Sequence, residues 1–216
     1  MIRAIIFDFD GVIVDSVDVK GLAFAEIYSK YGGGIAEKVL SHHRSNGGMS
    51  RKVKFKYYHD TFLDSKLSNQ ELSKLESKFS SLVVERVIAA PFINGSHEFL
   101  QENHNVYDLY ISTATPESEI ITILNSRGIY RNFKGVYGSP RPKKDHVKKI
   151  LKIGHYSNSE IVFVGDSITD KNAAVQNQTY FIGKIDEYNG FENEMFWVND
   201  LTELSSVIKA FNKRDR

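Results

Sequence analysis

The stretch Ile5-Ile6-Phe7-Asp8-Phe9-Asp10-Gly11 decides how the rest of this chain is interpreted. The run from Ile2 to Phe9 is rich in β-branched and aromatic residues, as is typical of a buried strand. Two acidic residues and a glycine close it. In an open α/β sheet, ligands bind just beyond the carboxyl ends of the strands. We therefore expect Asp8 and Asp10 to lie in a functional site.

The spacing of the two acidic residues suits metal and phosphoryl chemistry. Carboxylates at positions i and i+2 share one face of a strand, and their oxygens are suitable ligands for a hard cation such as Mg²⁺. One carboxylate can attack phosphorus while the other transfers a proton. The alternative is a strand end whose acidic residues only face solvent.

A second apolar strand, from Ile161 to Val164, ends in the same way. Gly165-Asp166 follows it, and a further acid, Asp170, comes four residues after Asp166. Asp166 would complete a metal site, and Asp170, in the following helical turn, would hydrogen-bond a ligand or a metal-bound water. The alternative is a strand-to-helix turn in which an aspartate only caps the helix.

A third strand, which ends in hydroxyl residues, indicates phosphate binding. It reaches Thr113 and runs into Thr115-Pro116, which we expect to be the N-cap and first residue of a helix. Anions bind at helix N-termini, so Thr113 is well placed for a phosphate oxygen. As a β-former, Thr113 could equally be a buried strand residue with a satisfied hydroxyl group.

A lysine near residue 143 is the fourth candidate. The turn-rich segment 138–145 leads into a helix expected from about Lys144 to Ile153, and a lysine at this entry would neutralise phosphate charge. Most of the lysines nearby are expected to be solvated surface charges. The register favours Lys143 over Lys144.

In chain order these four segments supply Asp-x-Asp, a strand-terminal Thr, a Lys, and Gly-Asp with a further acid, and they resemble the motifs of the haloacid dehalogenase-like superfamily. The first segment resembles the subgroup of phosphoglycolate phosphatase and β-phosphoglucomutase. The resemblance covers essentially the whole chain. It implies an α/β fold: a doubly wound, Rossmann-like parallel sheet formed by residues 1–15 and 91–216, with an inserted α-helical cap domain, residues 16–90, that determines substrate specificity.

The resemblance also implies a role for each motif residue. Asp8 would be the nucleophile and Asp10 the acid/base, with a pKa raised by its enclosed setting. Thr113 and Lys143 would bind the substrate phosphate. Asp8, the backbone carbonyl of Asp10, and Asp166 would hold Mg²⁺. The implied activity is that of a Mg²⁺-dependent phosphatase, which hydrolyses a small phosphomonoester metabolite through an aspartyl phosphate.

Other functions remain open at this stage. A phosphomutase of the β-phosphoglucomutase type would share every core residue, and a non-catalytic phospholigand-binding protein would not need both Asp8 and Asp10. Dehalogenases generally lack the second acid of Asp-x-Asp, so Asp10 argues against them. Phosphonate hydrolysis would need a cap lysine that forms a Schiff base, and Lys52 and Lys54 keep it open.

The alternation of elements after Pro91 predicts a parallel sheet. We expect helices near 95–103, 116–127 and 201–211 and through Ala173-Ala174, and strands at 107–113, 135–137, 161–164 and 179–182. Trp197 is expected in core or sheet-edge packing.

The segment 16–90 is expected to be entirely helical and cationic. Apolar spacing marks a helix through Tyr28 that Gly32-Gly33-Gly34 closes.

The segment holds 12 basic and 8 acidic residues, which leaves a net charge of −3 for the rest of the chain. Five basic residues and no acidic one lie between His42 and Lys56. The flexible Asn46-Gly47-Gly48 interrupts this stretch, which resembles the substrate-specificity segment of the subgroup's cap. The resemblance implies that Arg44 contacts an anionic substrate that bears a second acidic or polar group; the alternative is a solvated basic face. His42-His43 has no third metal ligand at a recognised spacing.

Composition excludes several classes. The net charge of +1 gives no whole-molecule argument for nucleic-acid or membrane binding. Without cysteine there are no disulfides, thiol catalysis or cysteine zinc sites. No apolar stretch approaches the ~20 residues that span a bilayer, and no basic segment with an apolar stretch precedes the first strand, so no signal peptide is expected. We expect a cytoplasmic monomer or homodimer.

Overall fold

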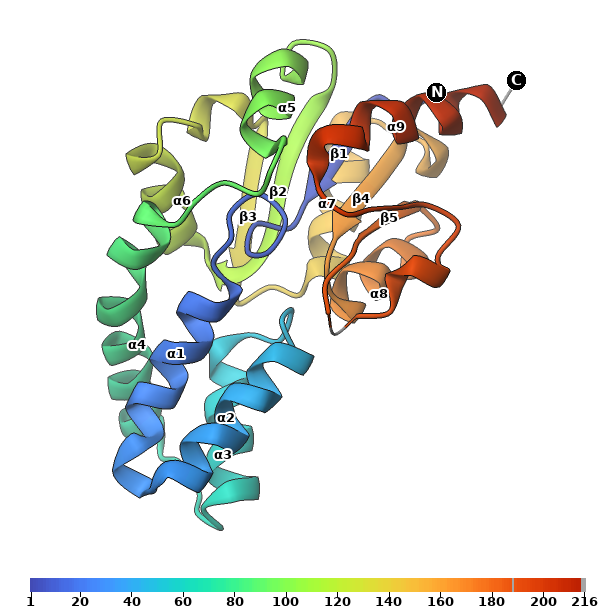
Figure 1. The fold of residues 1–216 in the computed structure, drawn as a ribbon. Helices are drawn as coiled ribbons and strands as arrows, with labels where there is room; N and C mark the ends of the chain where they lie inside the picture. Colours follow the sequence, from blue (N-terminus) through green and yellow to red (C-terminus); the bar gives the residue numbers. More distant parts are fainter. Residues whose placement is uncertain (188, 215–216) are drawn as a thin grey trace.

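The computed structural model describes residues 1–187 and 189–214, and its centre is a six-stranded parallel sheet (Figure 1). The strand order is β3-β2-β1-β4-β5-β6. The strands are β1 (Ala4–Phe7), β2 (Asp108–Pro116), β3 (Gly135–Ser139), β4 (Ile161–Gly165), β5 (Tyr180–Lys184) and β6 (Trp197–Val198). The predicted doubly wound α/β class is confirmed.

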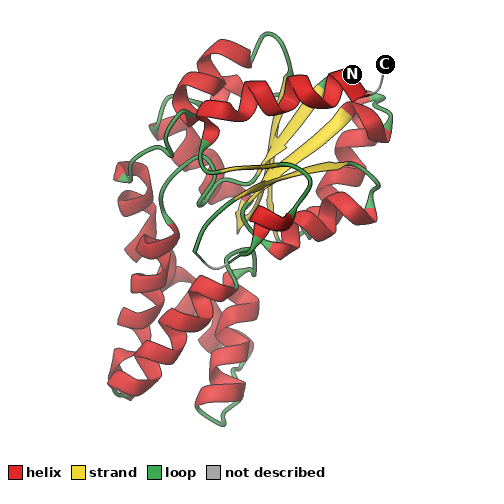
Figure 2. Ribbon diagram, turned by 45° about the vertical axis from the view of Figure 1, so that its right-hand side comes forward, coloured by secondary structure: helices red, strands yellow, loops and turns green. Residues whose placement is uncertain are grey.

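Helices cover both faces of this sheet because its strands are apolar on both faces (Figure 2). In β1, Ile5 and Phe7 belong to one hydrophobic cluster, whereas Ala4 and Ile6 belong to another. The first cluster includes side chains of α5 (Ser96–Asn103), α6 (Glu117–Ser126) and α9 (Leu204–Arg214). The second includes side chains of α7 (Lys143–Gly154) and α8 (Ile168–Gln176).

The segment between β1 and α5 is mainly helical, as predicted, and contains four α-helices that project from one end of the sheet (Figure 1). They are α1 (Val17–Tyr28), α2 (Gly33–Ser45), α3 (Arg51–Phe62) and α4 (Asn69–Ala89). Their shared core is aromatic: the Phe24 ring centroid lies 5.2 Å from that of Phe55 and 4.1 Å from that of Phe79. Ser68 and Glu71 form a capping box at the start of α4.

One prediction about this helical segment is wrong. The three glycines do not form one break, because Gly32 ends the first helical run at φ +95° while Gly33 and Gly34 begin α2. Within the stretch 42–56, α2 extends to Ser45 and α3 starts at Arg51, so Asn46-Gly47-Gly48 lies in a turn between them. Only a short turn separates these two helices.

The boundary between β2 and α6 also differs from the expectation. Strand β2 continues to Pro116, so Pro116, and not Thr115, is the N-cap of α6. Trp197 lies in the edge strand β6 with 39% of its surface exposed, which agrees with sheet-edge packing. In the described part of the chain, no helix has both the length and the apolar character needed to span a bilayer.

Candidate active site

The residues predicted from separate motifs meet at the carboxyl edge of the sheet. Asp8 follows β1 directly, Asp166 follows β4, and Thr113 lies within β2. Lys143 is the first residue of α7, the helix after β3. Because all of these strands are parallel, their carboxyl ends lie at one edge.

Three carboxylates form the centre of this site. One oxygen from each of Asp8, Asp166 and Asp170 lies within 4.8 Å of the other two, and all three residues are buried. The Lys143 Nζ is 2.5 Å from Asp8 Oδ2 and 2.6 Å from Asp170 Oδ1. We call these four residues the acidic centre. Three acidic groups against one ammonium leave an excess of negative charge in a buried place.

The carboxyl groups show the effect of this excess. Burial raises the pKa of Asp8 to about 7, and the charges of Asp170 and Asp10 add to the shift, although Lys143 opposes it. Burial, together with the charges of Asp8 and Asp170, also raises the pKa of Asp166 well above its ordinary value. A divalent cation would relieve this repulsion, so the acidic centre fits a metal site.

The hydrogen bonds divide the acidic centre into ligand candidates and a supporting group. Asp170 is already occupied: Oδ1 accepts from Lys143, and Oδ2 accepts from the backbone N–H and the hydroxyl group of Ser167. The Asp166 carboxylate accepts no hydrogen bond from any described residue. Asp166 is therefore the strongest ligand candidate, whereas a hydrogen bond from Asp170 to a ligand or a metal-bound water stays a prediction.

Gly11 is required where the Asp166 carboxylate approaches the loop after β1. A Cβ on Gly11 would lie 2.1 Å from Asp166 Oδ2, and the backbone φ of +79° also favours glycine. This glycine lets the ends of β1 and β4 share one site.

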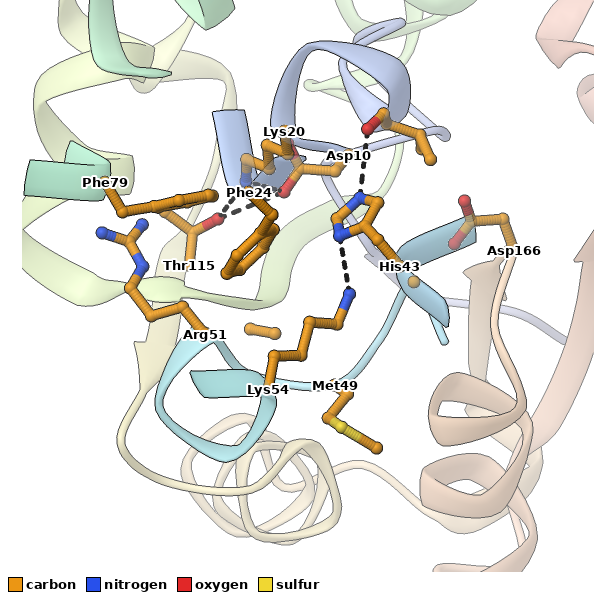
Figure 3. A pocket seen from close by; sticks show the side chains of 13 residues that line it. Asp10, Lys20, Phe24, His43, Met49, Arg51, Lys54, Phe79, Thr115 and Asp166 are labelled. Carbon is orange, nitrogen blue, oxygen red and sulfur yellow. Dashed lines mark hydrogen bonds and ion pairs between the residues drawn. The ribbon is translucent and has the colours of Figure 1, made fainter. Parts of the chain in front are cut away.

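The Asp10 side chain points away from the acidic centre into a second polar cluster (Figure 3). Its carboxylate accepts hydrogen bonds from Lys20 Nζ at 2.5 Å, Ser16 Oγ at 2.6 Å and Thr115 Oγ1 at 3.1 Å. Burial acts to raise the pKa of Asp10, but the charge of Lys20 and these hydrogen bonds outweigh it and lower the pKa. The expectation of a raised pKa is wrong because an ammonium group, and not an apolar wall, faces this carboxylate.

Lys20 and Thr115 were not identified from the sequence as site residues. Lys20 donates to Thr115 Oγ1 at 2.7 Å, and Thr115 in turn donates to Asp10. The sequence contains one indication that Lys20 belongs to the site. Lys20 lies four residues after Ser16, and this spacing places two residues on the same face of a helix. The sequence predicts Thr115 as the N-cap of α6, but Thr115 lies inside β2 and cannot have that role.

Thr113 and Lys143 lie together, as their assignment to phosphate binding requires. Both line one cavity that the turn at Gly48 also lines. Thr113 is buried, and its Oγ1 accepts a hydrogen bond from the Thr115 N–H at 3.2 Å. Lys143 contacts the acidic centre, whereas Lys144 is exposed. Contact with phosphate stays a prediction for both Thr113 and Lys143.

The basic residues of segment 42–56 have different surroundings. Arg44 forms an ion pair of 3.0 Å with Asp18 near the surface. Arg51 is buried in an ion pair with Glu119 of α6, and Lys54 is buried beside His43. Lys52 is exposed. The stretch is therefore not a uniformly basic surface, and the contact of Arg44 with substrate stays a prediction.

The parallel sheet with helices on both faces makes this a Rossmann-like α/β protein. The carboxylates clustered at the carboxyl edge of the sheet form a site that suits a metal ion. The chain belongs to the haloacid dehalogenase-like hydrolases, because the model of that family matches residues 5–184. The resemblance found in the four motifs is thus confirmed. No curated protein matches the sequence.

Solved structures show the same fold at low identity. The β-phosphoglucomutase of Clostridium difficile is 19% identical, with 99% of each chain covered and a TM-score of 0.78. The HAD hydrolase YfnB of Bacillus subtilis, bound to magnesium, is 17% identical, with 96% of this chain and 99% of that chain covered and a TM-score of 0.72. CbbY of Rhodobacter sphaeroides, in complex with phosphate, is 16% identical, with coverages of 94% and 96% and a TM-score of 0.72.

Proposed function

We propose that this hydrolase is a Mg²⁺-dependent phosphatase that acts on a small phosphomonoester through an aspartyl phosphate on Asp8. The observation that carries the proposal is the contact of the buried Asp8 carboxylate with Lys143. Beside it lies the Asp166 carboxylate, which accepts no hydrogen bond from any described residue. A carboxylate in this position can take up a phosphoryl group while a cation stabilises the charge on its oxygens.

The reaction would have two steps. An Asp8 oxygen attacks phosphorus, the bond from phosphorus to the ester oxygen breaks, and the leaving alkoxide takes up a proton. Water then attacks the same phosphorus, the bond to Asp8 breaks, and inorganic phosphate leaves. Lys143 would offset charge on the phosphoryl oxygens in both steps, and Thr113 would donate a hydrogen bond to one of them.

Asp8, Asp166 and the backbone carbonyl of Asp10 would hold the Mg²⁺, which supplies further neutralisation of phosphoryl charge when bound. Oxygen ligands from carboxylates and a carbonyl suit this ion. The magnesium-bound YfnB structure supports the choice of metal by analogy of fold.

Asp10 would accept the proton of the attacking water in the second step. Its lowered pKa keeps it ionised, as a base must be. For the first step Asp10 must carry a proton, and the negative charge of a bound phosphate ester would raise its pKa toward that state.

We further propose that residues 16–90 are a cap that closes over this site. The turn at Gly48 lies directly against the core, because a Cβ on Gly48 would be 1.8 Å from Thr169 Oγ1 and 2.3 Å from Ser167 Oγ. Such close contact would exclude bulk water from an aspartyl phosphate.

A phosphate-release screen tests the proposal. Purified protein is given a panel of small phosphomonoesters with Mg²⁺, beside the variant Asp8→Asn and the control Asp145→Asn, which changes an exposed acid of α7. We expect release that depends on Mg²⁺, is lost in Asp8→Asn by about 10⁴-fold or more, and is unchanged in the control. Release that persists in Asp8→Asn would overturn the proposal.

A phosphomutase remains the alternative within the same core chemistry. It would have to keep water from the aspartyl phosphate while a bisphosphate reorients. Isomerised product that depends on a bisphosphate activator, with little free phosphate, would choose the mutase.

One observation favours phosphonate hydrolysis as a second candidate. Lys54 is buried, and it lines the same pocket as Asp10 and Asp166, whereas Lys52 is exposed. The Lys54 amine could condense with a substrate carbonyl, which forms an imine and water. Borohydride reduction in the presence of a carbonyl-bearing phosphonate would label Lys54 if this candidate is right and leave it unlabelled if it is wrong.

A further inference from the structure

A pocket between the helices and the end of β2 adjoins the acidic centre (Figure 3). We call it the cap pocket. Asp10 and Asp166 lie at its wall on the core side. A phosphate ester whose phosphorus faces Asp8 would extend its other end toward this space. The rest of the wall combines apolar and basic side chains: Phe24, Phe79, Met49, Lys20, Arg51 and Lys54, with His43 beside them.

Two of the three cations in this wall are already paired. Lys20 is paired with Asp10 at 2.5 Å. The Arg51 guanidinium binds Glu119 through both terminal nitrogens, at 2.5 and 2.9 Å, and also donates to Ser80 Oγ at 2.6 Å. Only 6% and 8% of the Arg51 and Glu119 side chains are exposed. A bidentate pair in such a dry place leaves Arg51 little capacity to bind another anion.

Lys54 differs from the other two because no acidic group within the described residues forms an ion pair with it. Its Nζ lies 2.9 Å from His43 Nδ1, while His43 Nε2 lies 3.1 Å from the Val17 carbonyl oxygen. A carbonyl oxygen can only accept, so the His43 hydrogen is on Nε2 and Nδ1 accepts from Lys54. The side chain of Lys54 is thus held by a neutral acceptor, with its remaining bonding positions free for a ligand.

The surroundings of Lys54 disfavour its charged form. The residue is 1% exposed, and the Phe24 ring centroid lies 5.7 Å from Nζ. Burial and the charge of Lys20 lower the pKa of Lys54 to about 7, although Asp10 and Asp166 oppose this shift. In this apolar setting the Lys54 amine suits a hydroxyl or carbonyl oxygen, which it can bind without carrying a charge. A second carboxylate or phosphate would lose its hydration here, while Lys20 and Arg51 are already occupied by Asp10 and Glu119.

We propose that the cap pocket selects phosphomonoesters whose other end is uncharged and offers a hydroxyl or carbonyl oxygen to the Lys54 amine, and that Glu119 excludes a second anionic group by occupying Arg51. The proposal rests on the phosphatase function proposed above. It makes Glu119 a specificity-determining residue although it belongs to none of the four motifs. The sequence suggested a substrate that bears a second acidic or polar group. The proposal keeps the polar group and excludes the acidic one.

Three ligands with the same three-carbon chain test the proposal: glycerol 3-phosphate, glyceraldehyde 3-phosphate and 3-phosphoglycerate end in an alcohol, an aldehyde and a carboxylate. We expect the wild-type kcat/KM for the alcohol and the aldehyde to exceed that for the carboxylate by about tenfold or more. In Glu119→Gln, which frees Arg51, the value for the carboxylate should rise about tenfold while the other two stay within about twofold. The control Glu117→Gln removes an equal but exposed charge from the same helix and should leave the ranking unchanged.

Lys54→Met tests the amine independently, beside the control Lys52→Met. We expect the KM for the alcohol and the aldehyde to rise about tenfold in Lys54→Met only. If Glu119→Gln fails to fold because it leaves Arg51 buried and unpaired, the wild-type ranking and Lys54→Met still decide the matter. A wild-type preference for the carboxylate, or an unchanged kcat/KM for the carboxylate in folded Glu119→Gln, would overturn the proposal.

Binding to Asp8→Asn separates this proposal from the phosphatase function. Titration calorimetry of the same three ligands should give the same ranking without turnover. If this ranking is found but no phosphate is released by the wild type, the phosphatase function fails and the pocket assignment stands. If phosphate is released but the carboxylate binds best, only the pocket assignment fails.

Discussion

The acidic centre and the cap pocket lie side by side, yet their charges are balanced in opposite ways. In the acidic centre three carboxylates share one lysine, and the carboxylate of Asp166 has no hydrogen-bond donor among the described residues. In the cap pocket, Lys20 and Arg51 each have a carboxylate partner, and Lys54 has a neutral one. We infer from this difference that the acidic centre is suited to bind a cation and that the cap pocket is suited to bind an uncharged group.

Among the variants that probe the charge balance of the two regions, removal of Lys143 should have the largest effect, because the acidic centre then has no cation of its own. We expect Lys143→Met to lower kcat by about 10²- to 10³-fold, the usual loss for one well-placed electrostatic donor. Steady-state phosphate release at saturating Mg²⁺ measures it. The matched control is Lys144→Met, one residue along on the exposed side of α7. An equal loss in both variants would contradict the assignment of Lys143.

Asp166→Asn tests the excess of negative charge through stability. A carboxyl group whose pKa is raised from 3.8 in the folded state keeps a proton that the unfolded chain releases, so folding stability falls as pH rises between the two pKa values. Without metal, Asp166→Asn should therefore be more stable than the wild type, by a margin that grows as the pH rises above the ordinary carboxyl pKa of 3.8. Melting temperatures in chelator measure this difference.

Mg²⁺ should reverse the order of these two proteins, because a cation bound by the wild type stabilises its folded state. Buried histidines such as His146, whose pKa is lowered to about 4 by burial, make stability rise with pH in both proteins. Their contribution cancels in the comparison. A margin that is independent of pH and of metal would contradict the account.

Lys20→Met should have a moderate effect that depends on pH. Without the ammonium, the pKa of Asp10 rises, so the base form is lost at a higher pH than in the wild type. We expect the acidic limb of the kcat/KM profile to move to higher pH, with a loss of about tenfold on that limb and a smaller one above it. Lys30→Met, in the exposed turn after α1, is the control. A uniform loss at all pH values would indicate a structural role only.

Arg44→Ala should have the smallest effect. Arg44 and Asp18 form an ion pair whose side chains are 35% and 66% exposed, and such pairs contribute little. If substrates end in an uncharged group, their KM should rise by less than about threefold. A large rise for every anionic substrate would support the earlier interpretation of Arg44 as a substrate contact and would weaken the contrast between the two regions.

The sequence was most informative where chemistry and chain direction coincide. Asp8 and Asp166 each follow an apolar strand, and Thr113 lies near the end of another. Parallel strands bring such ends to one edge, so their meeting could be predicted. Lys143 was identified by the same logic, since α7 begins beside the end of β3.

The surroundings of Asp10 and Lys54 could not be predicted, because they depend on contacts between distant segments. Asp10 faces Lys20 and Thr115, which is 105 residues away in the chain. The basic residues of segment 42–56 had the composition of a solvated loop, but the packing of α3 against α4 and α6 buries Arg51. Periodicity within one segment does not indicate which partner neutralises a buried charge.

The central claim is that Asp8 carries the phosphoryl group, and trapping that group tests it most directly. Enzyme quenched in acid during turnover is treated with borohydride, which reduces an aspartyl phosphate to homoserine, and its peptides are then sequenced by mass spectrometry. The account predicts homoserine at position 8, and none there in Asp8→Asn. Steady phosphate release with position 8 always recovered as aspartate, or homoserine at Asp10 or Asp166 instead, would contradict it.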